Sequence, residues 1–315
     1  MRTIEMYACE DMMEAPHGIR FPEFKRIELA DRECFETYVK KFQPISCEYN
    51  FANLFTWQDG CQFSWTLYQN RVLVYDAVSK VSFMPLGRAL APRDLVFLSV
   101  QLQSTGLSPD FILCPESYLK DYPEISTYYR VEEKREIAEY LYDVNLLTEL
   151  TGEKLHKKKN LISQFKRKYP EYTVRPLEGR FRQKAFDLAQ KLMAKYKRPS
   201  KTLELEFSAI QSSFDRFDTL GLEGLALLVE DEVAAFSVFS RLNDTTFDIQ
   251  FEKSDIRFKG AAQLINQETA AFLQDRCRFL NREQDLGIEG LRQAKMSYDP
   301  IKLIQLYKLV FKSPA

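Results

Sequence analysis

Residues 245–264 read TTFDIQFEKSDIRFKGAAQL and predict a strand, a loop and a helix in immediate succession. The strand covers residues 245–252, and the helix begins near Gly260. The first turn of a helix has unpaired backbone N–H groups and the positive end of the helix dipole. A loop that opens into a helix in this way suits a phosphate or pyrophosphate.

The loop itself has the pattern Arg257-x-x-Gly260-x-Ala262. Gly260 would let a phosphate approach the backbone, and Arg257 would add a charged fork. The small side chains of Ala261 and Ala262 would keep the wall of the site thin. A glycine-started amphipathic helix that binds nothing has the same spacing, so the pattern alone leaves both interpretations open.

Length and composition indicate a globular protein with sizeable cores. The chain has 315 residues, which suggests two domains, and 45% of them are hydrophobic. The net charge of −1 gives no global attraction to nucleic acid or acidic membranes, so any such affinity needs a local patch. The N-terminal 16 residues are acidic and lack the apolar segment of a signal peptide. No apolar run approaches the roughly 18 residues of a membrane span, so we expect a cytoplasmic protein without an integral anchor.

The cysteines and histidines argue against a metal or disulfide framework. The six cysteines are scattered, with no C-x-x-C pair, which indicates reduced thiols. His17 and His156 are the only histidines, so a catalytic triad or a histidine-based metal site is a poor interpretation. We therefore expect no metal site.

The order of predicted elements repeats along the chain. Helix, hairpin, strand, helix, strand, helix and strand follow one another twice, although the residues themselves are not obviously repeated. This order predicts an α+β fold made of two units, each a mixed sheet flanked by helices. The first unit covers residues 1–147 and ends with a strand at 139–144. A connecting basic helix covers 148–170, and the second unit covers 171–315 and ends with a strand at 302–311.

The connecting segment, residues 151–170, reads TGEKLHKKKNLISQFKRKYP and is the most basic part of the chain. The helix that it predicts has Lys157 and Asn160 on the face opposite its apolar residues. This face is either a solvated lysine face or a surface for phosphates of RNA or lipid headgroups. Lys158 and Lys159 flank the apolar face and could turn inward toward a cleft, so Lys157, Lys158 and Asn160 are candidate substrate-binding residues.

Acidic residues cluster in residues 281–298, NREQDLGIEGLRQAKMSY. Glu283 and Asp285 follow a predicted strand and precede a helix, where ligands bind in open sheets. These two acids, and Glu252 at the end of the earlier strand, are candidate bases, although helix capping and surface pairing would also explain the cluster. Tyr298 is a candidate proton donor or a core aromatic residue, and Lys295 is a candidate substrate-binding residue.

These stretches are similar to known families. The repeated unit resembles the Gcn5-related N-acetyltransferase (GNAT) fold, in which a Gln/Arg-x-x-Gly-x-Gly/Ala loop holds the pyrophosphate of an acyl-coenzyme A. Arg257, Gly260 and Ala262 fit that loop. More specifically, the chain resembles the family named for the C-terminal domain of phosphatidylglycerol lysyltransferase. The segments that carry this resemblance are CEYNFANLFTW, TGEKLHKKKNLISQFKRKYP, FKGAAQLINQETA and NREQDLGIEGLRQAKMSYDP.

The resemblance implies two tandem GNAT-like (acyl-CoA N-acyltransferase) domains with a cleft between them. In characterised relatives it also implies transfer of an aminoacyl group from charged tRNA to a lipid headgroup. These relatives are kin to the Fem transferases of peptidoglycan bridges. We therefore expect an acyltransferase that moves an aminoacyl group from a tRNA-type donor to an amine or hydroxyl acceptor, with tRNA as a partner. An acetyl-coenzyme A dependent N-acetyltransferase and a non-catalytic phosphate- or RNA-binding module are the alternatives. No cofactor beyond the donor is expected, and the oligomeric state stays open.

Overall fold

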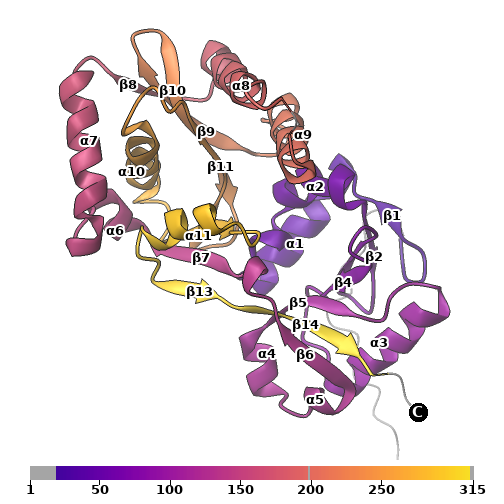
Figure 1. Cartoon of the computed structure of the whole chain (residues 1–315). Coiled ribbons are helices and arrows are strands. Elements are labelled where there is room, and N and C mark those ends of the chain that lie inside the picture. Colours follow the sequence, from indigo (N-terminus) through magenta and orange to yellow (C-terminus); the bar gives the residue numbers. More distant parts are fainter. Residues whose placement is uncertain (1–18, 198, 313–315) are drawn as a thin grey trace, which may run out of the picture.

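The computed structural model describes residues 19–197 and 199–312, which form two seven-stranded mixed sheets with helices around them (Figure 1). This confirms the predicted fold class, an α+β protein made of two tandem GNAT-like units. Within these residues, no helix combines the length and the apolar character that crossing a membrane requires.

The first sheet has the strand order β1-β2-β3-β4-β5-β14-β6. Its strands are β1 (Lys25–Arg26), β2 (Phe63–Leu67), β3 (Val72–Asp76), β4 (Val81–Phe83), β5 (Phe111–Pro115), β6 (Tyr129–Glu133) and β14 (Leu306–Phe311). The helices of this half are η1 (Leu29–Asp31), α1 (Arg32–Phe42), η2 (Cys47–Tyr49), α2 (Phe51–Cys61), α3 (Pro92–Ser104), α4 (Glu116–Asp121), α5 (Ile125–Tyr128) and η3 (Arg135–Ile137).

The second sheet has the strand order β13-β7-β12-β11-β10-β9-β8. Its strands are β7 (Glu139–Asp143), β8 (Thr173–Pro176), β9 (Glu223–Val229), β10 (Glu232–Arg241), β11 (Thr246–Ser254), β12 (Phe279–Gln284) and β13 (Lys302–Ile304). The helices around it are α6 (Val144–Glu149), η4 (Glu153–Leu155), α7 (His156–Lys168), α8 (Gly179–Met193), α9 (Lys201–Asp215), α10 (Ala261–Leu273) and α11 (Glu289–Met296).

Local sequence signals explain where several elements begin. The Asn50 side chain accepts a hydrogen bond from Ala52 N at 3.1 Å and caps α2, and Ser200 caps α9 in the same way through Leu203 N. The hairpin turn between β2 and β3, at Gln69 and Asn70, has φ angles of 45° and 56°, which match the right-handed twist of the two strands. Side-chain caps thus determine where α2 and α9 begin, and the turn geometry determines how β2 and β3 are joined.

The two sheets exchange strands, which the sequence analysis did not foresee. β7 was expected to close the first unit, but it lies in the second sheet between β12 and β13. The expected final strand at 302–311 is two strands, and β14 returns to the first sheet between β5 and β6 (Figure 1). Tyr140 and Tyr142 of β7 accordingly lie in the core of the second unit. The limits that the sequence analysis set for the first unit, at residue 147, and for the connecting helix, at residue 170, remain predictions.

A shared apolar core holds the two units against each other. The buried residues Phe35 and Trp65 of the first unit belong to the same cluster as Phe214 and Phe236 of the second. Helix α2 packs on α9 across this junction. Because a continuous core resists sliding, residues from the two units meet in a fixed geometry.

Candidate active site

The parallel strands β11 and β12 open away from each other. They pair only at Thr246–Phe279, Phe247–Leu280 and Asp248–Asn281, although β11 continues to Ser254 and β12 to Gln284. β10 covers the other edge of β11 as far as Ser254. The edge of β11 that faces β12 beyond residue 248 is therefore left for another chain or ligand to pair with.

A cavity of about 500 Å³ lies at this opening. Its walls come from β11, β12, α2, α9 and α11, so both units contribute. The polar and charged residues among its lining are Ser200, Thr202, Glu206, Gln250, Glu252, Lys253, Arg282, Glu283, Gln284 and Lys295. A concave site of this size with a few convergent polar groups has the properties of a small-ligand site. Three expected site residues, Glu252, Glu283 and Lys295, meet here.

An ion pair between Glu252 and Arg282 bridges the two diverging strands. Glu252 also accepts a hydrogen bond from Asn266 of α10 at 3.2 Å. Arg282 lies 4.8 Å from the ring centre of Tyr298 and 5.5 Å from that of Tyr142. Burial alone would lower the pKa of Arg282, but the Glu252 carboxylate raises it above its ordinary value, so the guanidinium stays charged. Its buried Nη1 has no hydrogen-bond partner among the described residues and is a free donor.

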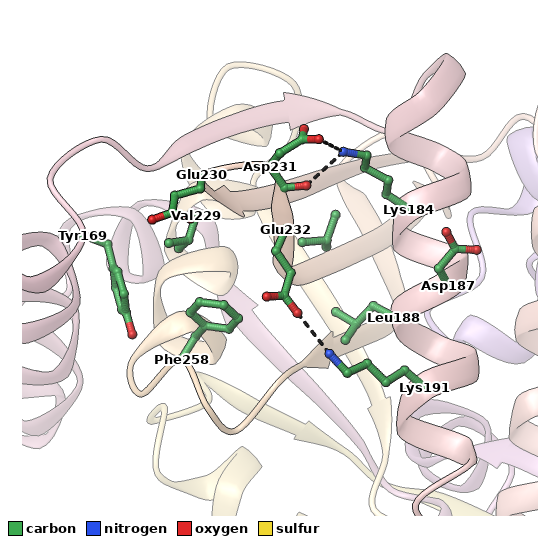
Figure 2. Close-up of a pocket in the computed structure, with 11 residues that line it drawn as sticks. Tyr169, Lys184, Asp187, Leu188, Lys191, Val229, Glu230, Asp231, Glu232 and Phe258 are labelled. Carbon is green, nitrogen blue, oxygen red and sulfur yellow. Dashed lines mark hydrogen bonds and ion pairs between the residues drawn. The ribbon is translucent and has the colours of Figure 1, made fainter.

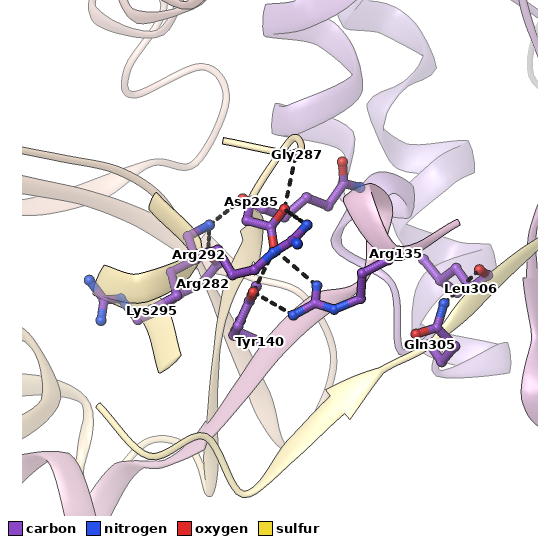
Figure 3. A network of polar contacts seen from close by, with 10 residues as sticks. Arg135, Tyr140, Arg282, Asp285, Gly287, Arg292, Lys295, Gln305 and Leu306 are labelled. Carbon is purple, nitrogen blue, oxygen red and sulfur yellow. Dashed lines mark hydrogen bonds and ion pairs between the residues drawn. The ribbon is translucent and has the colours of Figure 1, made fainter. Parts of the chain in front are cut away.

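Lys295 and Glu283 also line the cavity. The Lys295 ammonium donates hydrogen bonds to the backbone carbonyls of Arg282 and Gln284, as Figure 3 shows in part. Burial lowers the pKa of Lys295, and Glu283 partly counteracts this. Burial also raises the pKa of Glu283 well above its usual range. Tyr298 lies behind Arg282, and burial raises its pKa to about 12, so its hydroxyl is neutral near pH 7.

Asp285, the other expected base, is not among the residues that line this cavity. Its fully buried carboxylate accepts hydrogen bonds from Arg135, Arg292, Tyr140 and the backbone N–H of Gly287. These bonds hold the pKa of Asp285 well below its usual value against the opposing effect of burial. The residue joins η3, β7 and α11, and its role as a base stays a prediction.

The expected phosphate loop has other partners in this structure. Arg257 pairs with Asp255 at 2.9 Å and with Glu232. Gly260 has a φ of 96°, and a Cβ atom there would lie 2.5 Å from the backbone oxygen of Leu161 in α7. Ala261 is buried and donates its N–H to Phe258, whereas the neighbouring residue 262 is exposed. The glycine is thus required by the close approach of α7, and a phosphate-binding role for this loop stays a prediction.

This packing leads to a prediction for Gly260→Ala. The added methyl group would collide with the α7 backbone, and the positive φ is unfavourable for alanine. We expect a loss of about 2–4 kcal/mol in the free energy of unfolding, measured by urea denaturation. Gly290→Ala is the matched control, because a Cβ at Gly290 meets nothing within 4 Å. Equal stability of the two variants would contradict the close-packing role.

Helix α7 presents its lysines in two ways. Lys157, Lys159 and Asn160 are exposed, whereas Lys158 is half-buried. Its Nζ atom lies 4.4 Å from the ring centre of Tyr298. Burial and the nearby Arg282 lower the pKa of Lys158. One of the two flanking lysines therefore turns inward, next to the residues behind the cavity.

A larger cavity of about 640 Å³ lies between α8, the β9–β10 turn and Phe258 (Figure 2). Its lysines already have acidic partners, since Lys184 pairs with Asp231 and Lys191 pairs with Glu232. None of the expected catalytic residues lines it. The opening between β11 and β12 is therefore the better candidate for chemistry.

The two mixed sheets flanked by helices form a tandem GNAT-like fold. The model of the family described as phosphatidylglycerol lysyltransferase, C-terminal, matches residues 39–310, and the chain belongs to this family. No curated protein gave a match to the chain.

Solved structures support the fold. A conserved protein of unknown function from Bacteroides thetaiotaomicron is 28% identical, with a TM-score of 0.84 over 92% of this chain and 99% of that one. The C-terminal domain of a putative lysylphosphatidylglycerol synthetase from Agrobacterium fabrum is 12% identical, with a TM-score of 0.64 over 91% and 93% of the two chains. FemX is 7% identical, with a TM-score of 0.54 over 92% and 97%.

Proposed function

We propose that this protein catalyses acyl transfer in the cavity between β11 and β12. The observation that carries the proposal is the open strand pair, with the Glu252–Arg282 ion pair across it. The free edge of β11 can pair with the extended part of a donor, and a transfer reaction needs donor and acceptor held side by side in one site. The resemblance in fold to a lysylphosphatidylglycerol synthetase domain and to FemX supports an acyl donor.

The donor that fits best is an aminoacyl-tRNA. A coenzyme A donor would place its pyrophosphate at the loop of residues 255–260, but there α7 covers Gly260 and two carboxylates neutralise Arg257. Helix α7 instead offers exposed Lys157 and Lys159 beside the inward-turned Lys158. Lysines on this surface can hold the phosphates of the acceptor end of a tRNA, while its ester reaches the cavity.

The chemistry requires no covalent intermediate. The amine or hydroxyl of the acceptor attacks the carbonyl carbon of the aminoacyl ester, and Glu252 takes the proton that the attacking group loses. Arg282 Nη1 donates to the carbonyl oxygen as negative charge develops there. The bond between the carbonyl carbon and the ribose oxygen then breaks, a new amide or ester remains, and Glu252 returns the proton to the leaving ribose oxygen, which becomes a hydroxyl. Tyr298 keeps Arg282 in place through its ring.

The experiment that tests this function is thermal-shift titration with bulk charged tRNA and, in parallel, with acetyl-coenzyme A. Transfer is then followed with a radiolabelled amino acid. Its label should leave the charged tRNA and appear in a lipid or a non-lipid fraction that supplies amines and hydroxyls as acceptors. A shift with charged tRNA together with transfer supports the proposal. A shift with coenzyme A alone would replace it with an acetyltransferase. No shift with either would leave a non-catalytic module.

The tRNA surface leads to a second prediction. We expect the double variant Lys157→Glu and Lys159→Glu to weaken charged-tRNA binding at least about tenfold and to flatten its salt dependence, because phosphate contacts are lost. Fluorescence anisotropy at several salt concentrations measures both effects. The double variant Arg88→Glu and Arg93→Glu is the control, since both arginines are exposed and lie just before and at the start of α3, which Figure 1 shows in the half of the molecule away from α7. Equal weakening by both double variants would leave only non-specific attraction.

A further inference from the structure

We propose that Cys47, Asp248 and Glu283 bind a divalent metal ion of zinc type at the junction of the two units. Cys47 opens η2 in the first unit, whereas Asp248 and Glu283 lie on β11 and β12 of the second. The Cys47 sulfur and one carboxylate oxygen from each acid lie within 4.8 Å of one another. Asp248 and Glu283 lie 201 and 236 positions after Cys47 in the chain, and the fold brings both to the same thiol.

The buried oxygens of this cluster lack partners. Asp248 is fully buried, and its Oδ1 accepts no hydrogen bond from the residues that the structure describes. Its Oδ2 accepts one from the amide of Asn50 at 3.2 Å. Glu283 Oε1 is also buried and unpartnered. A buried carboxylate oxygen without a donor is unfavourable, and a cation is the group that would complete its coordination.

The surroundings contain more carboxylates than cations. Glu139 is fully buried and takes its hydrogen bonds from Ser46, the Cys47 backbone and Asn281. Glu48 accepts one from Gln284 at 2.7 Å. Lys295 and Arg282 are the cations close to the cluster. The hydrogen bonds of the Lys295 ammonium go to backbone carbonyls, and Arg282 pairs with Glu252.

The pKa shifts agree with this charge imbalance. Burial and the neighbouring Glu283 carboxyl raise the pKa of Asp248. Burial also raises the pKa of Glu283, and Glu48 and Glu139 add to this against the opposing charge of Lys295. A cation between the two carboxylates would oppose their mutual repulsion.

The donor set selects the kind of ion. A thiolate with two carboxylates suits zinc, whereas magnesium and calcium prefer oxygen ligands alone. Ligand atoms in a tetrahedral zinc site are about 3.5 Å apart, so the three side chains need to close by roughly 1 Å on binding. The thiol, whose pKa burial raises, gives up its proton to solvent as the metal–sulfur bond forms. Glu283 also lines the cavity, so the fourth coordination position of the metal ion can face the cavity. Zinc sites with three protein ligands leave this position to water or a substrate.

The test uses the whole chain, stripped with a chelator and titrated with zinc chloride. We expect one zinc ion per chain by calorimetry and a rise in Tm of roughly 5 °C at a hundredfold excess over Kd. With cobalt(II) we expect a thiolate-to-metal charge-transfer band that Cys47→Ser removes. Cys277→Ser is the matched control, because this half-buried thiol lies outside the cluster and should leave the band unchanged. These readouts need no catalytic activity, so they stand or fall separately from acyl transfer.

Asp248→Asn separates metal binding from folding. The amide keeps the shape of the side chain and removes a buried charge, so the metal-free variant should be at least as stable as the wild type. We expect it to lose the response of Tm to zinc. Glu283→Gln should behave alike. The proposal is overturned if the wild type binds no zinc, or if the Tm response and the cobalt band survive in Cys47→Ser and Asp248→Asn.

Discussion

Replacing Arg282 with glutamine is expected to lower the rate of acyl transfer by about two to three orders of magnitude, the usual cost of removing a donor that stabilises a developing oxyanion. Arg282 is held by Glu252 and by the rings of Tyr142 and Tyr298, and its Nη1 has no partner within residues 19–197 and 199–312. A glutamine in its place is too short to bridge the strands and carries no charge. Single-turnover transfer from charged tRNA measures the effect.

The matched control is Arg278→Gln, because Arg278 is exposed and immediately precedes the same strand, β12. We expect it to transfer at the wild-type rate. If Glu252 and Arg282 act as one unit, the double variant Glu252→Gln and Arg282→Gln should be little slower than either single variant. Circular dichroism must show that Arg282→Gln is folded, and a folded variant with the full rate would refute the role of the guanidinium.

The second large effect is expected for the stability of Asp285→Asn. The Asp285 carboxylate is fully buried and joins Arg135, Arg292 and Tyr140 (Figure 3). An asparagine would leave two guanidinium groups without their shared counter-charge, and breaking a buried ion pair from one side costs about 3–5 kcal/mol. Urea denaturation measures the free energy of unfolding.

Glu289→Gln provides the comparison for that measurement. Glu289 is an exposed acid at the start of α11, four residues after Asp285. We expect this variant to change the free energy of unfolding by less than about 0.5 kcal/mol. If Asp285→Asn changed the free energy of unfolding as little as Glu289→Gln, the ion pairs of Asp285 would not contribute to stability.

The sequence predicted the fold class well and the exchange of strands poorly. Hydrophobic periodicity marks a strand, but it carries no information about which neighbour the strand will pair with. β7 and β14 read as ordinary strands, so their places in the opposite sheets follow from tertiary packing alone.

The candidate site was predicted in part. Glu252, Glu283 and Lys295 were selected by their positions at strand ends and in α11, and they meet in one cavity. Arg282 received no role, since nothing in its sequence context shows that its guanidinium is buried against two rings.

Two other residues show the limits of motif spacing. Gly260 was singled out for the approach of a phosphate, which stays a prediction, whereas the neighbour that the structure places against it is the backbone of α7. Cys47 and Asp248 are far apart along the chain, and no spacing motif joins them.

The position of β14 also affects how the chain folds during synthesis. The first sheet lacks the strand between β5 and β6 until residue 311 has left the ribosome. At ordinary elongation rates, β6 therefore waits roughly 10 to 40 s for its partner. Meanwhile the facing edges of β5 and β6 are open to other strands. Until β14 emerges, the first half of the nascent chain is therefore exposed to wrong strand pairing at these two edges.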